Sequence, residues 1–216
     1  TIVLMKPSLP VSWFDACIIP RHDKPPVASH VLATTGVLNT VHPVHGGRDA
    51  GRGLLLVGGT STHFHWQSAG VVAQILRLCE AHPAIHWTLT NSRRTPEDFL
   101  PLLQEQALAN LTVIPWQDTP DGWVKQQLEQ AGQVWVTRDS VSMVFESITA
   151  AAPTGLLQLE VARESRVVNS MLDLIGMGWA QDFAAWDVQQ RLPAPPQELW
   201  EADRAARWLL KRCRGV

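Results

Sequence analysis

Tyrosine is absent from the sequence, cysteine is scarce, and positive and negative charges nearly balance. A formal net charge of −2 over 216 residues provides no overall positive field that would attract nucleic acid or an anionic membrane. The cysteines, Cys17, Cys79 and Cys213, are odd in number and widely spaced, which favours free thiols in a reducing compartment over a disulfide framework. No apolar run approaches the ~20 residues that a membrane-spanning helix needs. We therefore expect a cytoplasmic globular protein without a transmembrane segment that binds no nucleic acid.

The first residues also lack the signals that usually open a chain. The segment TIVLMKPSLPVSWFD (1–15) has no initiator methionine, no basic region and no small-residue cleavage site of a signal peptide. It begins directly with an apolar stretch that is typical of a strand. We therefore expect that residues preceding Thr1 are missing from this sequence.

Short apolar stretches alternate with helical patterns along most of the chain. Three strands without helices between them are expected near the amino end, at residues 1–5, 16–20 and 31–35. Farther on, strands are expected at 54–59, 85–91, 111–116, 133–137 and 154–160, with helices at 67–82, 95–108, 121–132, 140–151 and 163–176 between and after them. Apolar strands separated by helices are typical of a parallel sheet covered on both faces. The expected fold class is α/β, with a Rossmann-like, doubly wound parallel sheet.

This rhythm divides the chain into four expected parts. Residues 1–45 are the remnant of an N-terminal α/β domain, and residues 46–52 are a linker. Residues 53–185 form a Rossmann-like nucleotide-binding domain, and residues 186–216 a Pro-rich segment with a C-terminal helix. Ligands of such sheets bind outside the carboxyl ends of the strands, so the turns that follow the strands are the candidate sites.

The first candidate turn is GGTSTHFHW (58–66). Gly58 and Gly59 would let the backbone approach a ligand closely, and Thr60 and Ser61 add hydroxyl groups before a helix. Unpaired amides and the helix dipole at such a point favour a phosphate or carboxylate. A tight turn with a hydroxyl cap and no ligand is an equally good interpretation.

The second candidate turn is TNSRRTPED (90–98). Thr95 has the features of a helix N-cap, with Pro96 at the first helical position and acidic residues after it. Capping does not explain the three residues before Thr95. Two of them are arginines, and an arginine fork matches the geometry of a phosphate. These residues are candidates for phosphate contact, with solvated surface charge as the alternative: Ser92, Arg93 and Arg94.

The third candidate turn is VTRDSVSMVFES (136–147). Either Asp139 or Ser140 can cap the helix, which leaves Ser142 and the helix amides free to meet an anion. Glu146 could accept two hydrogen bonds from a ribose diol. The alternative for Glu146 is an exposed helix position, but its apolar neighbours indicate a buried helix, where a carboxylate without a partner is costly.

Five segments together resemble the elongated-mitochondria family, whose plant members are mitochondrial fission factors and whose bacterial members are described as glycosyltransferases or epimerase-like proteins. The resemblance covers nearly the whole chain and rests on FDACIIPRHD (14–23), TTGVLNTVHP (34–43), LLLVGGTST (54–62), TNSRRTP (90–96) and VTRDSVSMVFES (136–147). It implies a GT-B fold, in which two Rossmann-like domains face a cleft, and it implies that most of the acceptor-binding domain is missing here.

The stretch RDSVSMVFE (138–146) is also similar to the donor-binding turn of peptidoglycan N-acetylglucosaminyltransferases. That similarity implies that Glu146 holds the nucleotide ribose and that Ser140, Ser142 and Met143 flank the diphosphate. The sequence departs from the family pattern in three places: Arg138 replaces an acidic residue, AAAP (150–153) replaces Thr-Gly-Lys-Pro, and GGTS replaces a GGPS-like loop.

His22 is the catalytic candidate. It lies with Asp23 at the end of an expected strand facing the presumed cleft, where a histidine beside a carboxylate could act as general base toward an acceptor hydroxyl. A structural role in lining the cleft is equally consistent with the pattern. No Asp-x-Asp motif is present, and His63 with His65 lacks an evident third ligand, so no metal cofactor is indicated.

The leading hypothesis is a nucleotide-sugar-dependent glycosyltransferase of GT-B type, of which this chain is mainly the donor-binding domain. A non-catalytic scaffold related to the fission factors is the alternative, and a sugar-nucleotide epimerase-like enzyme is a weaker one. The expected partners are a nucleotide-diphosphate sugar and, through the C-terminal helix, either the missing N-terminal domain or a second copy. Peripheral attachment to the inner membrane is the alternative to a free cytoplasmic location.

Overall fold

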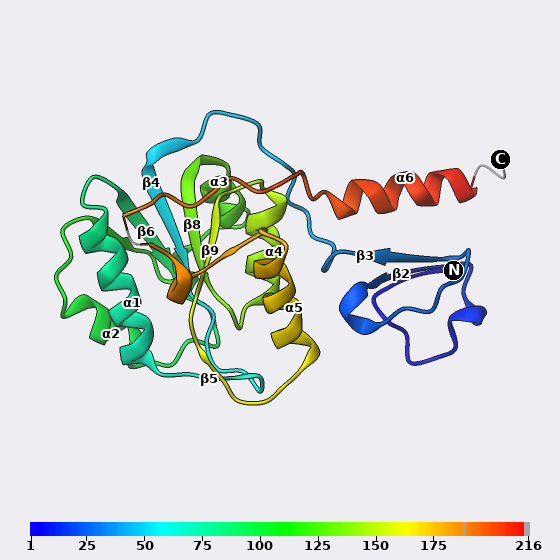
Figure 1. The fold of residues 1–216 in the computed structure, drawn as a ribbon, viewed down its shortest axis with the longest axis horizontal. Helices are drawn as coiled ribbons and strands as arrows, with labels where there is room; N and C mark the ends of the chain where they lie inside the picture. Colours follow the sequence, from blue (N-terminus) through cyan, green and yellow to red (C-terminus); the bar gives the residue numbers. More distant parts are fainter. Residues whose placement is uncertain (188, 214–216) are drawn as a thin grey trace.

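The computed structural model describes residues 1–187 and 189–213, and within them the strands form two parallel sheets and one short antiparallel pair (Figure 1). The large sheet has six strands in the order β11-β9-β8-β4-β6-β7, and every neighbouring pair is parallel. Its strands are β4 (Asp49–Leu56), β6 (His86–Thr90), β7 (Leu111–Val113), β8 (Ala131–Thr137), β9 (Thr154–Leu157) and β11 (Gln181–Asp182). The α/β, parallel-sheet prediction is confirmed.

The strand order shows where a ligand crevice would open. Counted along the chain, the strands of the large sheet lie in the order 6-5-4-1-2-3, which is the doubly wound Rossmann order read from the other edge. The chain therefore leaves β4 toward one edge and β8 toward the other. Sheets of this kind bind ligands at the carboxyl ends of the two strands where the winding reverses. Here these two strands are β4 and β8.

Helices cover both faces of the large sheet. Alternate residues of β4 point to opposite faces, so Leu55 packs with α1 (Ser68–Ala81) and α2 (Phe99–Gln104). Leu54 packs on the other face, with the remaining helices of this domain. These are α3 (Trp123–Gln130), α4 (Val141–Thr149) and α5 (Arg166–Gly176).

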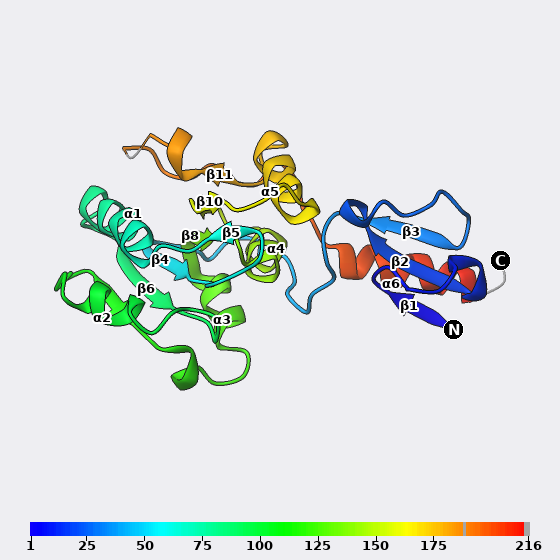
Figure 2. The same ribbon diagram turned by 90° about the horizontal axis from the view of Figure 1, so that it is seen from below.

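The small sheet consists of three parallel strands, β1 (Ile2–Leu4), β2 (Ala16–Pro20) and β3 (Val31–Thr34). After the large domain the chain returns to the small sheet. There α6 (Glu201–Cys213) lies beside these strands (Figure 2). Arg204 donates to the Ala33 carbonyl at 2.6 Å, and Glu201 accepts a hydrogen bond from the Thr35 amide at 3.1 Å. The C-terminal helix therefore belongs structurally to the small, amino-terminal lobe.

Several boundaries differ from those expected from the sequence. The second helix begins at Phe99 with Asp98 at its N-cap, so the prediction that Thr95 caps this helix is wrong. β4 begins at Asp49, within the segment that the sequence indicated as a linker. An antiparallel pair, β5 (Phe64–His65) with β10 (Glu160–Val161), was not expected, since each strand has only two residues and carries no periodic pattern.

Two properties of the described residues bear on the class of protein. No helix in the described part of the chain has the length and apolarity that crossing a membrane requires. The three cysteines are free thiols; Cys17 and Cys79 are buried, and Cys213 is exposed. Burial raises the pKa of the Cys79 thiol to about 12, so this thiol stays protonated at neutral pH.

The turn after α4 keeps the backbone shape of a glycine turn without the glycine. The Ala151 amide donates to the Ile148 carbonyl at 2.9 Å and the Ala152 amide to the Ser147 carbonyl at 3.2 Å, the two bonds of a Schellman motif. Ala151 has φ 60°, the left-handed conformation that this motif requires and that glycine adopts without steric cost. The AAAP departure noted above therefore preserves the turn but places a strained alanine in it.

We expect Ala151→Gly to stabilise the protein by about 0.5–1 kcal/mol, because it removes the left-handed strain of an alanine. The matched control is Ala150→Gly, whose φ of −63° is right-handed. Ala150→Gly should destabilise the protein, because glycine at a right-handed position increases the conformational entropy of the unfolded chain and removes a buried methyl group. Urea denaturation of both variants measures the difference. An Ala151→Gly variant that loses as much stability as the control would contradict this account of the turn.

Candidate functional site

The turns after β4 and β6 are locked together at the carboxyl edge of the large sheet. Ser92 Oγ donates to the Gly58 carbonyl at 2.8 Å, and Thr95 Oγ1 donates to the same carbonyl. The Thr60 amide donates to the Arg94 carbonyl at 3.0 Å. Thr95 therefore joins the two turns, which explains its hydroxyl group without a capping role.

Asp139, in the turn after β8, lies at the centre of this edge. Its Oδ2 accepts a hydrogen bond from the Gly59 amide at 2.9 Å and lies 2.8 Å from Arg94 Nη2, while its side chain is 0% exposed. The neighbouring Gly58 amide donates to Thr137 Oγ1 at 2.7 Å. The Gly58 and Gly59 amides, which the sequence suggested for an anion, thus donate to side chains of the protein itself.

The two glycines are required by this internal arrangement. A Cβ added at Gly58 would lie 2.3 Å from Asp139 Oδ2, and one added at Gly59 would lie 2.0 Å from the Arg94 carbonyl oxygen. Both distances are far below van der Waals contact. Gly58 and Gly59 therefore allow close approach of the neighbouring turns, whereas the sequence suggested close approach of a ligand.

Burial dominates the electrostatics of Asp139. It raises the pKa of this carboxyl above its ordinary value, and hydrogen bonds from Gly59 and Thr137 and the charge of Arg94 only partly oppose the increase. The Oδ1 atom is buried and accepts no hydrogen bond from any described residue. Arg94 is thus the one cation within ion-pairing distance of this carboxylate among residues 1–187 and 189–213.

The two adjacent arginines have different surroundings. The Arg94 guanidinium, besides its ion pair, donates to the Thr60 carbonyl at 2.8 Å and to the Gly59 carbonyl at 3.4 Å. Arg93 is exposed and forms no side-chain hydrogen bond or ion pair within the part of the chain that the structure describes. Arg94 is therefore committed to the fold, and Arg93 is the arginine of this turn with a free guanidinium.

The amino end of α4 presents its amides without a side-chain cap. Ser140 occupies the N-cap position, but its side chain makes no capping hydrogen bond, and Asp139 is engaged elsewhere. Ser142 is exposed and Met143 is half-buried. Glu146 lies four residues after Ser142, so both side chains are on one face of the helix. Of the three turns, this one therefore keeps groups available to a ligand.

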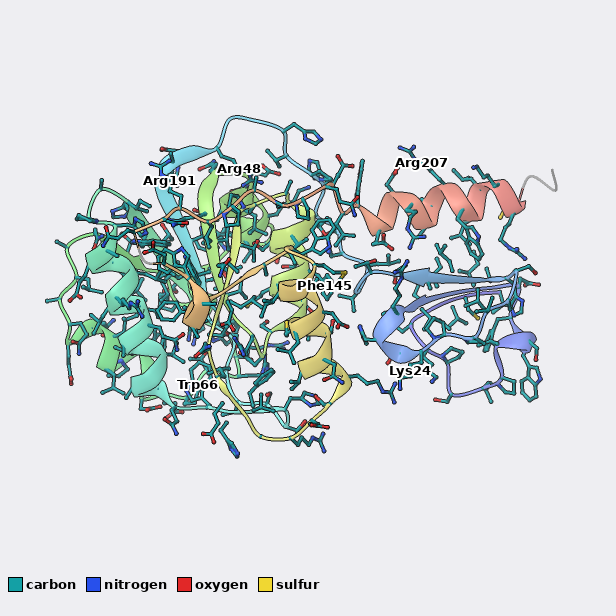
Figure 3. All side chains as sticks on the ribbon, in the orientation of Figure 1. Lys24, Arg48, Trp66, Phe145, Arg191 and Arg207 are labelled. Carbon is teal, nitrogen blue, oxygen red and sulfur yellow. The ribbon has the colours of Figure 1, made fainter. Side chains whose placement is uncertain are left out.

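Glu146 lies near the contact between the two lobes, which we call the lobe junction: Gly36 and Asn39 of the small lobe with Phe145 and Thr149 of α4. Asn39 Nδ2 donates to Thr149 Oγ1 at 3.1 Å, and a Cβ added at Gly36 would lie 2.1 Å from the Phe145 ring. Figure 3 shows Phe145 on the side of the large domain that faces the small lobe. The junction therefore brings α4 against the amino-terminal lobe.

The Glu146 carboxylate has no hydrogen bond or ion pair with any residue for which side-chain contacts are described, and the residue is half-buried. Burial raises the pKa of Glu146 above its ordinary value. A partly buried carboxylate that bonds to no other described residue gains nothing evident for folding, so Glu146 is a candidate for ligand contact.

His22 lines the space between the lobes. It belongs to the short helix η2 (Arg21–Asp23), and its side chain is 18% exposed. Two neighbouring cavities of about 360 and 380 Å³ adjoin it, between η2 and α5. Its Nε2 lies 3.9 Å from Asp23 Oδ2, beyond hydrogen-bonding distance, and Asp23 accepts a hydrogen bond from Arg166 Nη1 at 2.9 Å. The expected His–Asp pair is therefore adjacent, but Asp23 is bonded to Arg166.

The remaining positions singled out in the sequence have structural surroundings. Arg138, which replaces an acidic residue of the family pattern, donates to Asp182 Oδ1 at 2.8 Å and so ties β8 to β11. Ser61 Oγ accepts hydrogen bonds from the amides of His63 and Phe64 within its own turn. In residues 1–187 and 189–213 no three His, Cys, Asp or Glu side chains gather to hold a metal ion.

Replacing Arg94 by methionine should destabilise the protein by about 1–2 kcal/mol at neutral pH, because it leaves the buried Asp139 carboxylate without its cation. The pKa of Asp139 should then rise further, so the native state binds a proton more tightly than the unfolded state. The stability lost in Arg94→Met should therefore become smaller as the pH falls through the raised pKa of Asp139. Denaturation of Arg94→Met at several pH values, with Arg93→Met as the matched control, measures this. Equal losses in both variants, or a deficit independent of pH, would refute the role of Arg94.

The crystal structure of Acinetobacter baumannii MurG is similar to this chain, with 14% sequence identity and a TM-score of 0.48. The similarity covers 91% of this chain and 54% of that one, so the chain spans about half of that protein's length. No curated protein sequence matches the chain. The sequence model of the mitochondrial fission ELM1 family matches residues 1–213, and the chain therefore belongs to this family.

Proposed function

We propose that this chain binds a nucleotide-diphosphate sugar at the amino end of α4 and takes part in transfer of the sugar to an acceptor hydroxyl. The observation that carries the proposal is one face of α4, where uncapped amides, the exposed Ser142 and the half-buried Glu146, which bonds to no described residue, follow one another toward the lobe junction. The location, beside the point where a doubly wound sheet reverses its winding, also supports it.

Each group on this face has a role that fits its chemistry. The amides of the first turn of α4 and the Ser142 hydroxyl donate to the diphosphate, which the helix dipole favours. The Glu146 carboxylate accepts hydrogen bonds from the two ribose hydroxyls. Because burial raises the pKa of Glu146 and hydrogen bonds from a diol favour the charged form, nucleotide binding should lower this pKa. Arg93, whose guanidinium is exposed, supplies a positive charge to the diphosphate.

The transfer step uses the cavities beside His22. The acceptor oxygen attacks the anomeric carbon of the sugar, and the bond from that carbon to the diphosphate breaks. His22 takes the hydroxyl proton, and the nucleoside diphosphate leaves with the bonding electron pair. Phe145 lines the 360 Å³ cavity together with His22, and it is the residue before Glu146. This connection supports placing donor and acceptor at one junction.

A non-catalytic interaction protein is the second candidate, and a specific observation favours it. Asp139 accepts the hydrogen bond of the Gly59 amide and pairs with Arg94. Two of the expected phosphate ligands, this amide and the Arg94 guanidinium, therefore serve the fold. A chain that kept the architecture and lost a diphosphate site would have this appearance. The alternative predicts that no nucleotide binds, and binding is measured directly as follows.

A thermal-shift titration with UDP, GDP, ADP, dTDP and CMP tests the proposal. One nucleotide at about a hundred times its dissociation constant should stabilise the protein by roughly 2.7 kcal/mol, or roughly 5–10 °C in melting temperature for a chain of this size. Glu146→Gln should abolish the shift, and Arg93→Met should weaken it. The matched control is Glu105→Gln, an exposed carboxylate at the end of α2, which should leave the shift unchanged.

The variant also carries an internal check on folding. Glu146→Gln removes a desolvated charge, so without nucleotide it should be at least as stable as the natural protein at neutral pH. Absence of a shift with every nucleotide, on natural protein that melts cooperatively, would overturn the donor site and leave the interaction protein as the better account.

A further inference from the structure

A separate cavity of about 240 Å³ lies at the amino ends of the strands, at the opposite end of the large sheet from α4. Gln133 of β8 and Arg191 of the segment after β11 both line it, and Ile85 and Leu192 supply apolar walls. Figure 3 shows Arg191 at this end of the large sheet. The cavity is somewhat smaller than the ~300 Å³ typical of the smallest drug-binding pockets.

An irregularity in β4 lies beside the cavity, which Ala50 and Gly132 help to line. Asp49 pairs with Ala131 and Gly53 pairs with Gln133, so three residues of β4 lie opposite the single residue Gly132. Such a bulge bends a strand and redirects side chains, and bulges are common beside binding sites. A Cβ added at Gly132 would lie 2.6 Å from the Asp49 carbonyl oxygen, so the glycine is required here. Gly53, opposite Gln133, offers the glutamine no side chain to bond.

The Gln133 side chain is buried without any polar partner. The residue is 4% exposed, and neither its amide nitrogen nor its amide oxygen forms a hydrogen bond with any part of the chain that the structure describes. Buried amides are nearly always hydrogen-bonded in folded proteins, so a group with both atoms unsatisfied requires an explanation. A ligand with both a donor and an acceptor would satisfy it.

Arg191 adds a positive charge to the same cavity. It is exposed, and it makes no ion pair with any residue in the ranges 1–187 and 189–213. Burial lowers the pKa of His82, and the nearby charge of Arg191 lowers it further. The cavity thus has a cation at its mouth, apolar walls, and an amide on its buried side.

We propose that this cavity binds a small organic acid that carries an amide. The carboxylate pairs with the Arg191 guanidinium, the amide forms complementary hydrogen bonds with Gln133, and the apolar middle packs against Ile85 and Leu192. The site is independent of the proposed nucleotide site, because it lies at the other end of the strands and shares no residue with it.

N-acetylglycinate, which carries an amide and a carboxylate separated by one methylene group, is the probe. In a titration followed by ¹H–¹⁵N NMR, the side-chain amide of Gln133 and the backbone amides of Gly132 and Leu192 should shift saturably. N-acetylglycinamide, which lacks the charge, should bind at least tenfold more weakly. Gln133→Leu and Arg191→Gln should each weaken binding of N-acetylglycinate at least tenfold, and the matched controls Gln130→Leu and Arg163→Gln should not.

Both site variants should remain folded, because Gln133→Leu removes an unsatisfied buried group and Arg191 is at the surface. A cavity that holds only water would give no saturable shift at Gln133 with tens of millimolar probe, and that result would overturn the proposal. Unchanged affinity in both Gln133→Leu and Arg191→Gln would overturn it as well.

Discussion

The buried Asp139 carboxylate determines the geometry of the carboxyl edge of the large sheet. One of its oxygens binds the Gly59 amide and the Arg94 guanidinium, so a single charged group joins the turns after β8, β4 and β6. These segments are far apart in the sequence, and an unpaired carboxylate in this position would be strongly unfavourable. The close approach of Gly58 to Asp139 and of Gly59 to Arg94 follows from the same contact.

This contact also decides where a ligand can bind. Doubly wound sheets usually bind an anion at the turn after their first strand, and in this chain an internal carboxylate takes that position. The groups that remain available lie one turn away, on α4, where the helix amides have no cap and Glu146 has no partner among the described residues. Because Phe145 of the same helix contacts the small lobe at Gly36, a ligand on α4 would lie beside the cavities that adjoin His22. The geometry thus favours a site at the lobe junction over one at the glycine turn.

The sequence predicted most of the fold and only part of the candidate site. Apolar stretches separated by helices suffice to predict a parallel sheet, because that pattern is local. The motifs also identified the family and the turns that meet at one edge. Sequence could not distinguish Arg93 from Arg94, since the difference is a contact with a carboxylate more than forty positions away. The glycines were assigned to a ligand for the same reason: the atoms that approach them come from distant turns. Ala151 shows the reverse case, in which a turn survives the loss of its usual residue because the backbone hydrogen bonds of α4 enforce it.

The hydrogen-exchange rate of the Gly59 amide, measured by NMR on the protein without ligand, tests the central claim most directly. If the amide donates to the buried Asp139 carboxylate, it should exchange as slowly as the Leu56 amide within β4, and it should exchange much faster once Asp139 is replaced by alanine. A Gly59 amide that exchanges as fast as that of the exposed Thr62 would show that Asp139 does not occupy this position. The glycine turn would then be open to an anion, and the argument for a site on α4 would lose its basis.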